Sequence, residues 1–201
     1  AVAALPSGGV MLFGGATPTG LQPVTYTLSG TTFSPEYPKF SPVYRTEHSL
    51  MYDPVRQENL LFGGKNPVGT PLSATWIWAA GNWELKTVAT APSARSGHRM
   101  SFDRQACVGL LFGGENAQGT ALNDFWSWNG TAWTQLTPTN LPTARARHGM
   151  AFDALRNRTI VYGGKSGTTL RADVWEWDGT NWAEASSSAR PAERHAAIMS
   201  Y

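Results

Sequence analysis

Short runs of apolar and aromatic residues alternate along the whole chain with segments rich in glycine, proline and polar residues. Each run has the length and the branched or aromatic content of a β-strand. Within 42–91 the runs fall at about 49–53, 59–63, 74–79 and 82–87. Trp76 and Trp78 stand two residues apart and therefore lie on one face of a strand. The run Leu60 to Phe62 is apolar on both faces, which predicts a strand buried on both sides.

The same order of runs returns about every fifty residues. A histidine opens the first run, a glycine pair closes the second, tryptophans mark the third, and an arginine stands three residues before the histidine position. The recurring residues are His48, His98 and His148; Gly63, Gly64, Gly113, Gly114, Gly163 and Gly164; Trp76, Trp126 and Trp175; Arg45, Arg95, Arg145 and Arg194. A fixed period of this length indicates a repeat protein. Four antiparallel strands per repeat, stacked to bury both faces, predict the blades of a β-propeller.

The turns between strands have their own sequence signals. Asn129-Gly130 and Asp178-Gly179 predict two-residue hairpin turns between the third and fourth strands. An aspartate follows the first strand of three repeats, where its side chain is expected to bond to the backbone of the turn. These residues are Asp53, Asp103 and Asp153.

The order Arg-x-x-His…Asp, apolar-Gly-Gly, Trp-x-Trp and then Trp resembles the kelch repeat of kelch-type propellers, over essentially the whole chain. The resemblance implies an all-β, kelch-type β-propeller domain over 1–201. Its four-stranded blades of about fifty residues are expected at approximately 1–41, 42–91, 92–141 and 142–190. Kelch-like propellers serve as protein-binding modules, as sugar-binding domains and as scaffolds of galactose-oxidase-like enzymes, so the fold leaves the function open.

Both ends of the sequence have the pattern of a first strand. Residues 194–201 repeat the start of a blade and predict the first strand of a further blade, and residues 1–5 have the same character. We therefore expect part of a larger propeller, whose end strands could self-associate. The alternative is a closed four-bladed ring in which the C-terminal strand completes the first blade and residues 1–5 are displaced.

Composition narrows the function classes. The chain has 201 residues and a net charge of +2, too small to indicate nucleic-acid binding. Cys107 is the only cysteine, which excludes an internal disulfide and a cysteine-based zinc site. No run of 18 or more apolar residues predicts a membrane span. The low lysine content and high tryptophan, threonine and glycine content resemble secreted bacterial kelch-like proteins, which implies an extracellular location.

The repeated residues are interpreted as structural. The histidines could form a symmetric metal site, but Ala197 occupies the fourth position, which favours bonding to a neighbouring blade's backbone. The arginines are expected to pair between blades or to bond loop carbonyls, and the tryptophans to fill the core rather than to stack on sugars. No motif tyrosine accompanies Cys107, as a galactose-oxidase-type copper site would require, and no other catalytic motif occurs. We expect no cofactor and no enzymatic activity.

Ligand binding is predicted on the long loops, which gather on one face while short turns occupy the other. The non-repeated basic residues there are the candidate ligand contacts: Lys65, Arg147, Lys165 and Arg171. Their charge favours an acidic protein or an anionic glycan. Two alternatives stay open: a structural segment of a larger propeller, and a scaffold portion of a galactose-oxidase-like enzyme whose active site lies elsewhere.

Overall fold

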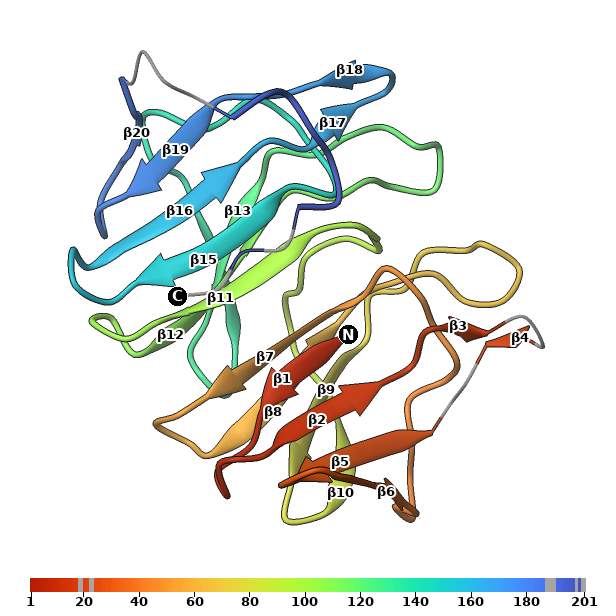
Figure 1. Ribbon diagram of the computed structural model, residues 1–201. Helices are drawn as coiled ribbons and strands as arrows, with labels where there is room; N and C mark the ends of the chain where they lie inside the picture. Colours follow the sequence, from red (N-terminus) through yellow and green to blue (C-terminus); the bar gives the residue numbers. More distant parts are fainter. Residues whose placement is uncertain (18–19, 22–23, 187–190, 198, 200–201) are drawn as a thin grey trace.

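Four separate four-stranded antiparallel sheets make up most of the molecule, one for each repeat (Figure 1). The computed structural model describes residues 1–17, 20–21, 24–186, 191–197 and 199, and none of these is in a helix. Within each sheet the strands pair in chain order. The predicted all-β propeller architecture is therefore confirmed.

The strands lie close to the positions that the pattern predicts. Blade 1 contains β1 (Val2–Ala4), β2 (Val10–Phe13), β5 (Thr25–Ser29) and β6 (Thr32–Glu36), and blade 2 contains β7 (Ser49–Asp53), β8 (Glu58–Phe62), β9 (Thr75–Ala79) and β10 (Asn82–Lys86). Blade 3 contains β11 (Arg99–Asp103), β12 (Val108–Phe112), β13 (Phe125–Trp128) and β14 (Trp133–Leu136), and blade 4 contains β15 (Gly149–Asp153), β16 (Arg158–Tyr162), β19 (Val174–Trp177) and β20 (Trp182–Glu184). Two short hairpins extend the connections of blades 1 and 4: β3 (Ala16–Thr17) with β4 (Gly20–Leu21), and β17 (Lys165–Ser166) with β18 (Thr169–Leu170).

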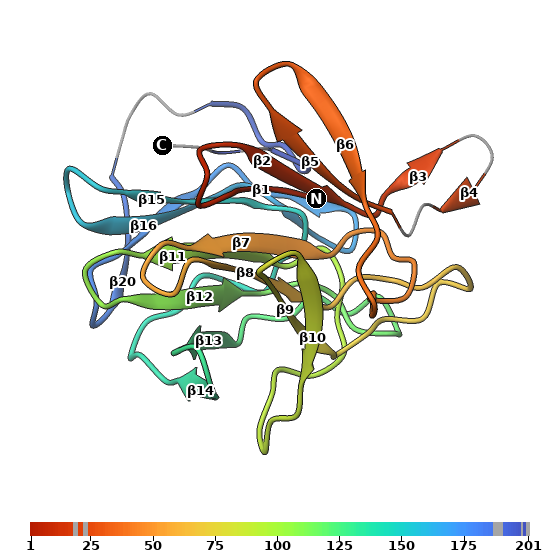
Figure 2. The same cartoon turned by 90° about the horizontal axis from the view of Figure 1, so that it is seen from below.

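The first strands of neighbouring blades contact one another in the order β1, β7, β11, β15, near the middle of the molecule (Figure 2). Val2 of β1 pairs with Leu12 of β2. Residues 1–5 are therefore not displaced from blade 1, and that part of the alternative expectation is wrong.

The described part of the predicted extra strand, 194–197 and 199, is not a β-strand, and residues 198, 200 and 201 lie outside the described residues. This segment nevertheless packs against blade 4. The Gly164 amide donates to the Arg194 carbonyl at 2.8 Å, as the Gly114 amide donates to the Arg145 carbonyl at 2.9 Å one repeat earlier. The segment thus takes up the same backbone contacts that begin each of the preceding blades.

Each pair of neighbouring sheets buries its own cluster of aromatic and aliphatic side chains. Phe62 of blade 2 and Trp133 of blade 3 meet edge to face, with ring centroids 5.3 Å apart. The Trp133 indole donates across the interface to the Thr75 hydroxyl at 2.9 Å, and the Trp83 indole makes the equivalent bond to Thr25 of blade 1 at 2.9 Å. Each indole therefore combines a large apolar contact with a satisfied polar group, which fixes how one blade sits on the next.

The glycine pair that ends each second strand is required by space and by backbone conformation. Gly63 and Gly64 have φ of +63° and +95°. A Cβ at Gly63 would lie 2.6 Å from the Arg95 carbonyl oxygen, and one at Gly64 would lie 2.7 Å from that of Thr46. Only glycine accommodates both the left-handed φ and this close approach to neighbouring backbone.

The turns agree with the prediction in kind and differ by one residue in register. Asp53 Oδ1 accepts from the Val55 and Arg56 amides, so the aspartate turn forms as expected. In the β13–β14 hairpin the Asn129 amide donates to the Ala132 carbonyl at 3.3 Å. Gly130 and Thr131 are therefore the central pair, not Asn129 and Gly130, because the Asn129 side chain accepts the turn amides instead. Asp178 flanks Gly179 and Thr180 of blade 4 in the same way.

The connections divide between two opposite faces. In Figure 1 the connections from the second to the third strand of each blade project to the right, and the turns from the first to the second strand lie to the left. We call the side with the longer connections, which also carries the blade-to-blade linkers, the loop face. The described residues include no helix able to cross a membrane.

Candidate functional site

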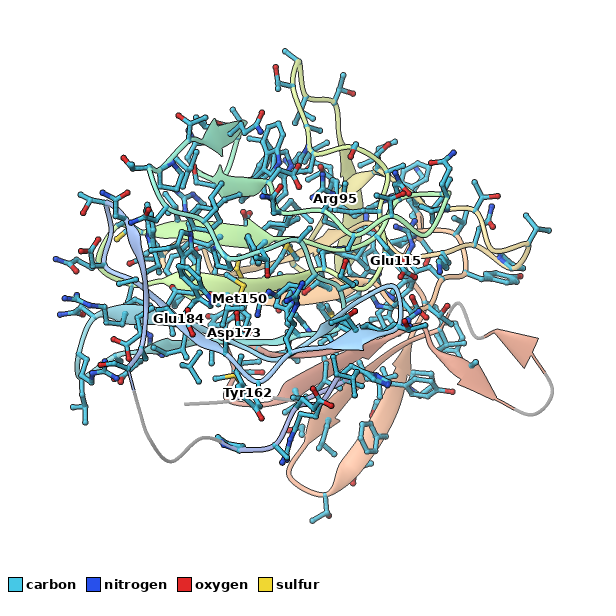
Figure 3. The ribbon with its side chains drawn as sticks, turned by 90° about the horizontal axis from the view of Figure 1, so that it is seen from above. Arg95, Glu115, Met150, Tyr162, Asp173 and Glu184 are labelled. Atoms are coloured by element: carbon cyan, nitrogen blue, oxygen red, sulfur yellow. The ribbon has the colours of Figure 1, made fainter. Side chains whose placement is uncertain are left out.

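The repeated arginines lie inside the loop-face end of the blades. Arg95 is fully buried; its Nη1 and Nη2 each donate to one carboxylate oxygen of Asp124 at 2.6 Å, and Nη1 also donates to the Gly113 carbonyl. Arg145 is fully buried and holds Asp173, labelled in Figure 3, in the same two-pronged way. All these partners belong to the arginine's own blade, so the expected pairing between blades is wrong and the alternative of loop carbonyls holds.

The same aspartates also anchor the third-strand tryptophans. Trp126 Nε1 donates to Asp124 Oδ2 at 2.6 Å, and Trp175 Nε1 donates to Asp173 Oδ2 at 2.7 Å. Burial by itself raises the pKa of Asp124, but the hydrogen bonds and charge of Arg95 and the Trp126 bond outweigh it, so the pKa lies below its usual value. Each of these two aspartates is therefore an ionised bridge between a buried cation and an indole.

The repeated histidines sit at the start of the first strands, pressed against the preceding blade. His48 Nε2 lies 3.1 Å from the Phe13 carbonyl oxygen, which is the expected bond to a neighbouring backbone. His98 and His148 are fully buried, and their rings meet Phe62 and Phe112 edge to face at 5.6 Å and 5.4 Å. Neither ring has a hydrogen-bond partner among the described residues, so for these two histidines the expected bond to a neighbouring backbone is wrong, and they contact the preceding blade through the phenylalanine rings instead. Burial lowers the pKa of His48, His98 and His148 well below the usual value, so these side chains are neutral at pH 7.

Two of the four predicted ligand contacts are paired with acids of this chain. Lys65 Nζ lies 2.8 Å from Glu115 Oε1, and Arg147 Nη2 lies 2.8 Å from Glu47 Oε1 and 3.1 Å from Glu115 Oε1. All four side chains are partly buried. Burial by itself raises the pKa of Glu47, but the hydrogen bond and charge of Arg147 and the charge of Lys65 outweigh it and lower the pKa. These four residues form a charge-balanced group, which we call the axial ion cluster.

The other two predicted contacts lie together on blade 4. Lys165 belongs to β17, where it pairs with Leu170 of β18, and Arg171 follows directly and donates its amide to the Gly164 carbonyl at 3.0 Å. Neither side chain has a salt bridge to a carboxylate within the described residues, and Arg171 Nε has no hydrogen-bond partner there. This pair therefore supplies positive charge that no carboxylate of the described residues pairs with.

The linker between blades 1 and 2 contains exposed apolar side chains that the sequence analysis did not single out. We call residues 37–44 the first linker. Its exposed apolar and aromatic residues are Tyr37, Phe40, Val43 and Tyr44, with 87%, 59%, 56% and 47% of their surface accessible. The second linker, 87–94, has Thr87, Thr90, Ser93 and Ala94 at these positions, and the third, 137–144, has Thr137, Asn140, Thr143 and Ala144. An alignment of the linkers alone would have revealed this difference.

Two positions, Arg194 and Cys107, are exposed, unlike the buried arginines and histidines of the repeats. Arg194 is exposed, and its Nε donates to the Ala192 carbonyl at 3.0 Å. Cys107 is an exposed free cysteine. Across the part of the chain that the structure describes, no group of three His, Cys, Asp or Glu side chains is arranged to hold a metal ion.

Comparison with known families gives one match and one absence. The model of the KLHDC2/KLHL20/DRC7 Kelch-repeats domain matches residues 2–201. No curated protein matches the chain. Kelch-repeat domains are generally protein-interaction modules.

Proposed function

Because this chain belongs to the kelch-repeat family of β-propellers, we propose that it is a non-enzymatic recognition module that binds a protein partner through its loop face. The first linker is the centre of the binding surface. The single observation that supports this location is the cluster of exposed apolar side chains where the equivalent linkers have small or polar ones.

Exposed aromatic residues are costly to leave in water and are the side chains that most often dominate protein interfaces. Tyr37 and Phe40 therefore serve as anchors that a partner covers. Lys39 Nζ lies 5.4 Å from the centre of the Phe40 ring, which adds a positive charge beside this aromatic surface.

The free positive charge on blade 4 supports an acidic character for the partner. Lys165 and Arg171 take no part in the axial ion cluster, so their charge is available to attract an acidic surface. Lys65 and Arg147 form ion pairs with Glu47 and Glu115. We therefore assign Lys65 and Arg147 a structural role in the loop face rather than a direct contact with the partner. An anionic glycan and a purely structural role are the alternatives, and the following experiment separates the glycan from a protein partner.

The test compares two double variants that differ only in the linker they change. Tyr37→Ala with Phe40→Ala removes the aromatic anchors, and Thr87→Ala with Thr90→Ala makes matched changes in the second linker. Proteins captured from a lysate of the source organism are identified by mass spectrometry, and the leading candidate is purified and titrated by calorimetry. We expect the aromatic double variant to bind about 100-fold more weakly, since each anchor contributes about 1–2 kcal/mol.

The matched variant is expected to bind like the wild type, and both variants to melt at the wild-type temperature. Equal binding by both variants would show that the first linker is not the interface. Binding to a glycan array, combined with no purified protein partner, would instead favour the carbohydrate alternative.

A further inference from the structure

The buried arginine of blade 2 lacks the carboxylate that its counterparts have. Blades 3 and 4 place Asp124 and Asp173 one residue before β13 and β19. The equivalent residue before β9 is Ala74. The two donors of the arrangement are retained in blade 2: the arginine is Arg45, and the tryptophan of the third strand is Trp76.

Arg45 makes only the backbone part of the contacts that its counterparts make. Its Nε donates to the Val43 carbonyl at 3.0 Å and its Nη1 donates to the Gly63 carbonyl at 3.0 Å. In blade 3 the Nη2 of Arg95 also donates to the Ser93 hydroxyl at 3.0 Å, and Thr143 supplies this hydroxyl in blade 4. Blade 2 has Val43 there, so Nη2 of Arg45 has no acceptor among the described residues.

The indole is unpartnered as well. Trp76 Nε1 is buried and has no hydrogen-bond partner in the described part of the chain, whereas Trp126 and Trp175 donate to their aspartates. In blades 3 and 4 both donors point at one carboxylate. Arg45 and Trp76 hold the equivalent positions of the repeat, which implies that their donors face the place that this carboxylate would take in blade 2.

This arrangement is costly without an anion. Arg45 is only 1% exposed, and a buried cation without a countercharge is strongly disfavoured. Burial lowers the pKa of Arg45 to about 10. A bound carboxylate would offset this cost through two charge-assisted hydrogen bonds, which the planar guanidinium is shaped to form.

We propose that Arg45 and Trp76 form a carboxylate-binding site, in which a carboxylate from outside this chain occupies the place that Asp124 takes in blade 3. One oxygen accepts from Nη1 of Arg45, and the other accepts from both Nη2 of Arg45 and Nε1 of Trp76. The position is reachable from solvent, since the side chains of Asp124 and Asp173 are 23% and 20% exposed and Val43 beside it is 56% exposed.

The site goes beyond the proposed function and does not require it, because its donors belong to blade 2 whether or not a protein covers the loop face. Two sources supply the same chemistry: a small free organic acid, and an aspartate or glutamate side chain of a bound protein. Both are tested with defined probes.

The experiment follows the indole N–H signals of the intact chain, labelled with ¹⁵N, during a titration with sodium acetate against sodium chloride at equal ionic strength. The Trp76 signal is identified by its loss in Trp76→Phe. We expect a saturable shift of this signal with acetate and none with chloride. Trp126 and Trp175 are internal controls whose signals stay in place, because their Nε1 atoms already donate to aspartates.

Ala74→Asp is the decisive variant, since it restores the residue pattern of blades 3 and 4. It is expected to move the Trp76 signal without added acid and to abolish the acetate response. A blocked peptide containing one aspartate, used in place of acetate, separates the sources: saturation by the peptide favours a protein side chain, and saturation by acetate alone favours a free acid. An unchanged Trp76 signal with both probes, or an acetate response that persists in Ala74→Asp, would overturn the proposal.

Discussion

Blades 2 and 3 share one backbone design, and two of their differences on the loop face bear on binding. Blade 3 fills the space between its buried arginine and its indole with Asp124, and the linker that enters it has small or polar residues. Blade 2 has Ala74 at that place, and its linker exposes Tyr37 and Phe40. The comparison teaches that the residues shared by blades 2 and 3 build the scaffold, whereas these departures in blade 2 leave donors and apolar surface available to a ligand.

The largest expected effect tests the scaffold side of this comparison. His48, His98 and His148 are buried, and their pKa values lie well below the usual value of 6.5. The unfolded chain takes up protons near pH 6.5 and the folded chain does not, so the free energy of unfolding falls as the pH drops below about 6.5. Three such sites give a slope of up to about 4 kcal/mol per pH unit. Urea denaturation between pH 7.5 and pH 5 measures it.

The variant His98→Gln serves as the control, because glutamine does not titrate. Its slope is expected to be smaller by about 1.4 kcal/mol per pH unit, whatever its stability at pH 7.5. A stability that stays constant from pH 7 to pH 5 would show that these histidines are protonated in the folded state, contrary to their burial.

A smaller effect is expected when blade 3 is made to resemble blade 2. Asp124→Ala leaves the fully buried Arg95 without its carboxylate and Trp126 Nε1 without its acceptor. We expect a loss of about 2–3 kcal/mol of unfolding free energy, below the range for a fully buried pair because the Asp124 side chain is partly exposed. Chemical denaturation measures the loss, and added acetate should restore part of it.

The reverse change, Ala74→Asp, sharpens the same comparison from the other side. It is expected to stabilise the chain by about 1–2 kcal/mol, through charge-assisted bonds to Arg45. If Asp124→Ala left the free energy of unfolding unchanged, the contact between Arg95 and Asp124 would not stabilise blade 3. The lack of this aspartate in blade 2 would then carry no energetic cost.

The period of the sequence was sufficient to predict the sheets, since strand alternation and glycine pairs are local signals. The strand predicted at 49–53 is β7 with the same bounds. The register of the β13–β14 turn was missed by one residue, because the side chain of Asn129 takes up turn amides that a central residue of the turn would leave free.

The contacts of the candidate site depend on the order of the blades in space. Glu47 and Arg147 are 100 residues apart and meet only because the first strands of three blades lie side by side. A count of basic residues on the loop face could not show that Arg147 and Lys65 are neutralised there. An alignment of the repeats, in contrast, already shows alanine at position 74 where blades 3 and 4 have aspartate. That this substitution removes the acceptor of two donors could be recognised only from the contacts of Asp124 with Arg95 and Trp126.

The smallest expected effect on stability separates the two pairs within the predicted basic set. Lys65→Glu with Arg147→Glu reverses both cations of the axial ion cluster and places four carboxylates together, at a cost of about 1–2 kcal/mol for two partly buried contacts. Lys165→Glu with Arg171→Glu meets no carboxylate partner among the described residues, so its unfolding free energy should stay within about 0.5 kcal/mol of the wild type.

Binding should show the opposite order: at low salt the blade 4 variant is expected to lose more affinity for an acidic partner. This difference should shrink at high salt, because exposed charges are screened over about 8 Å at physiological ionic strength. Denaturation curves and titrations of the purified partner at two salt concentrations measure both quantities. Equal loss of affinity in the two variants, with no dependence on salt, would show that the partner does not use the free charge of blade 4 and that the apolar first linker accounts for binding by itself.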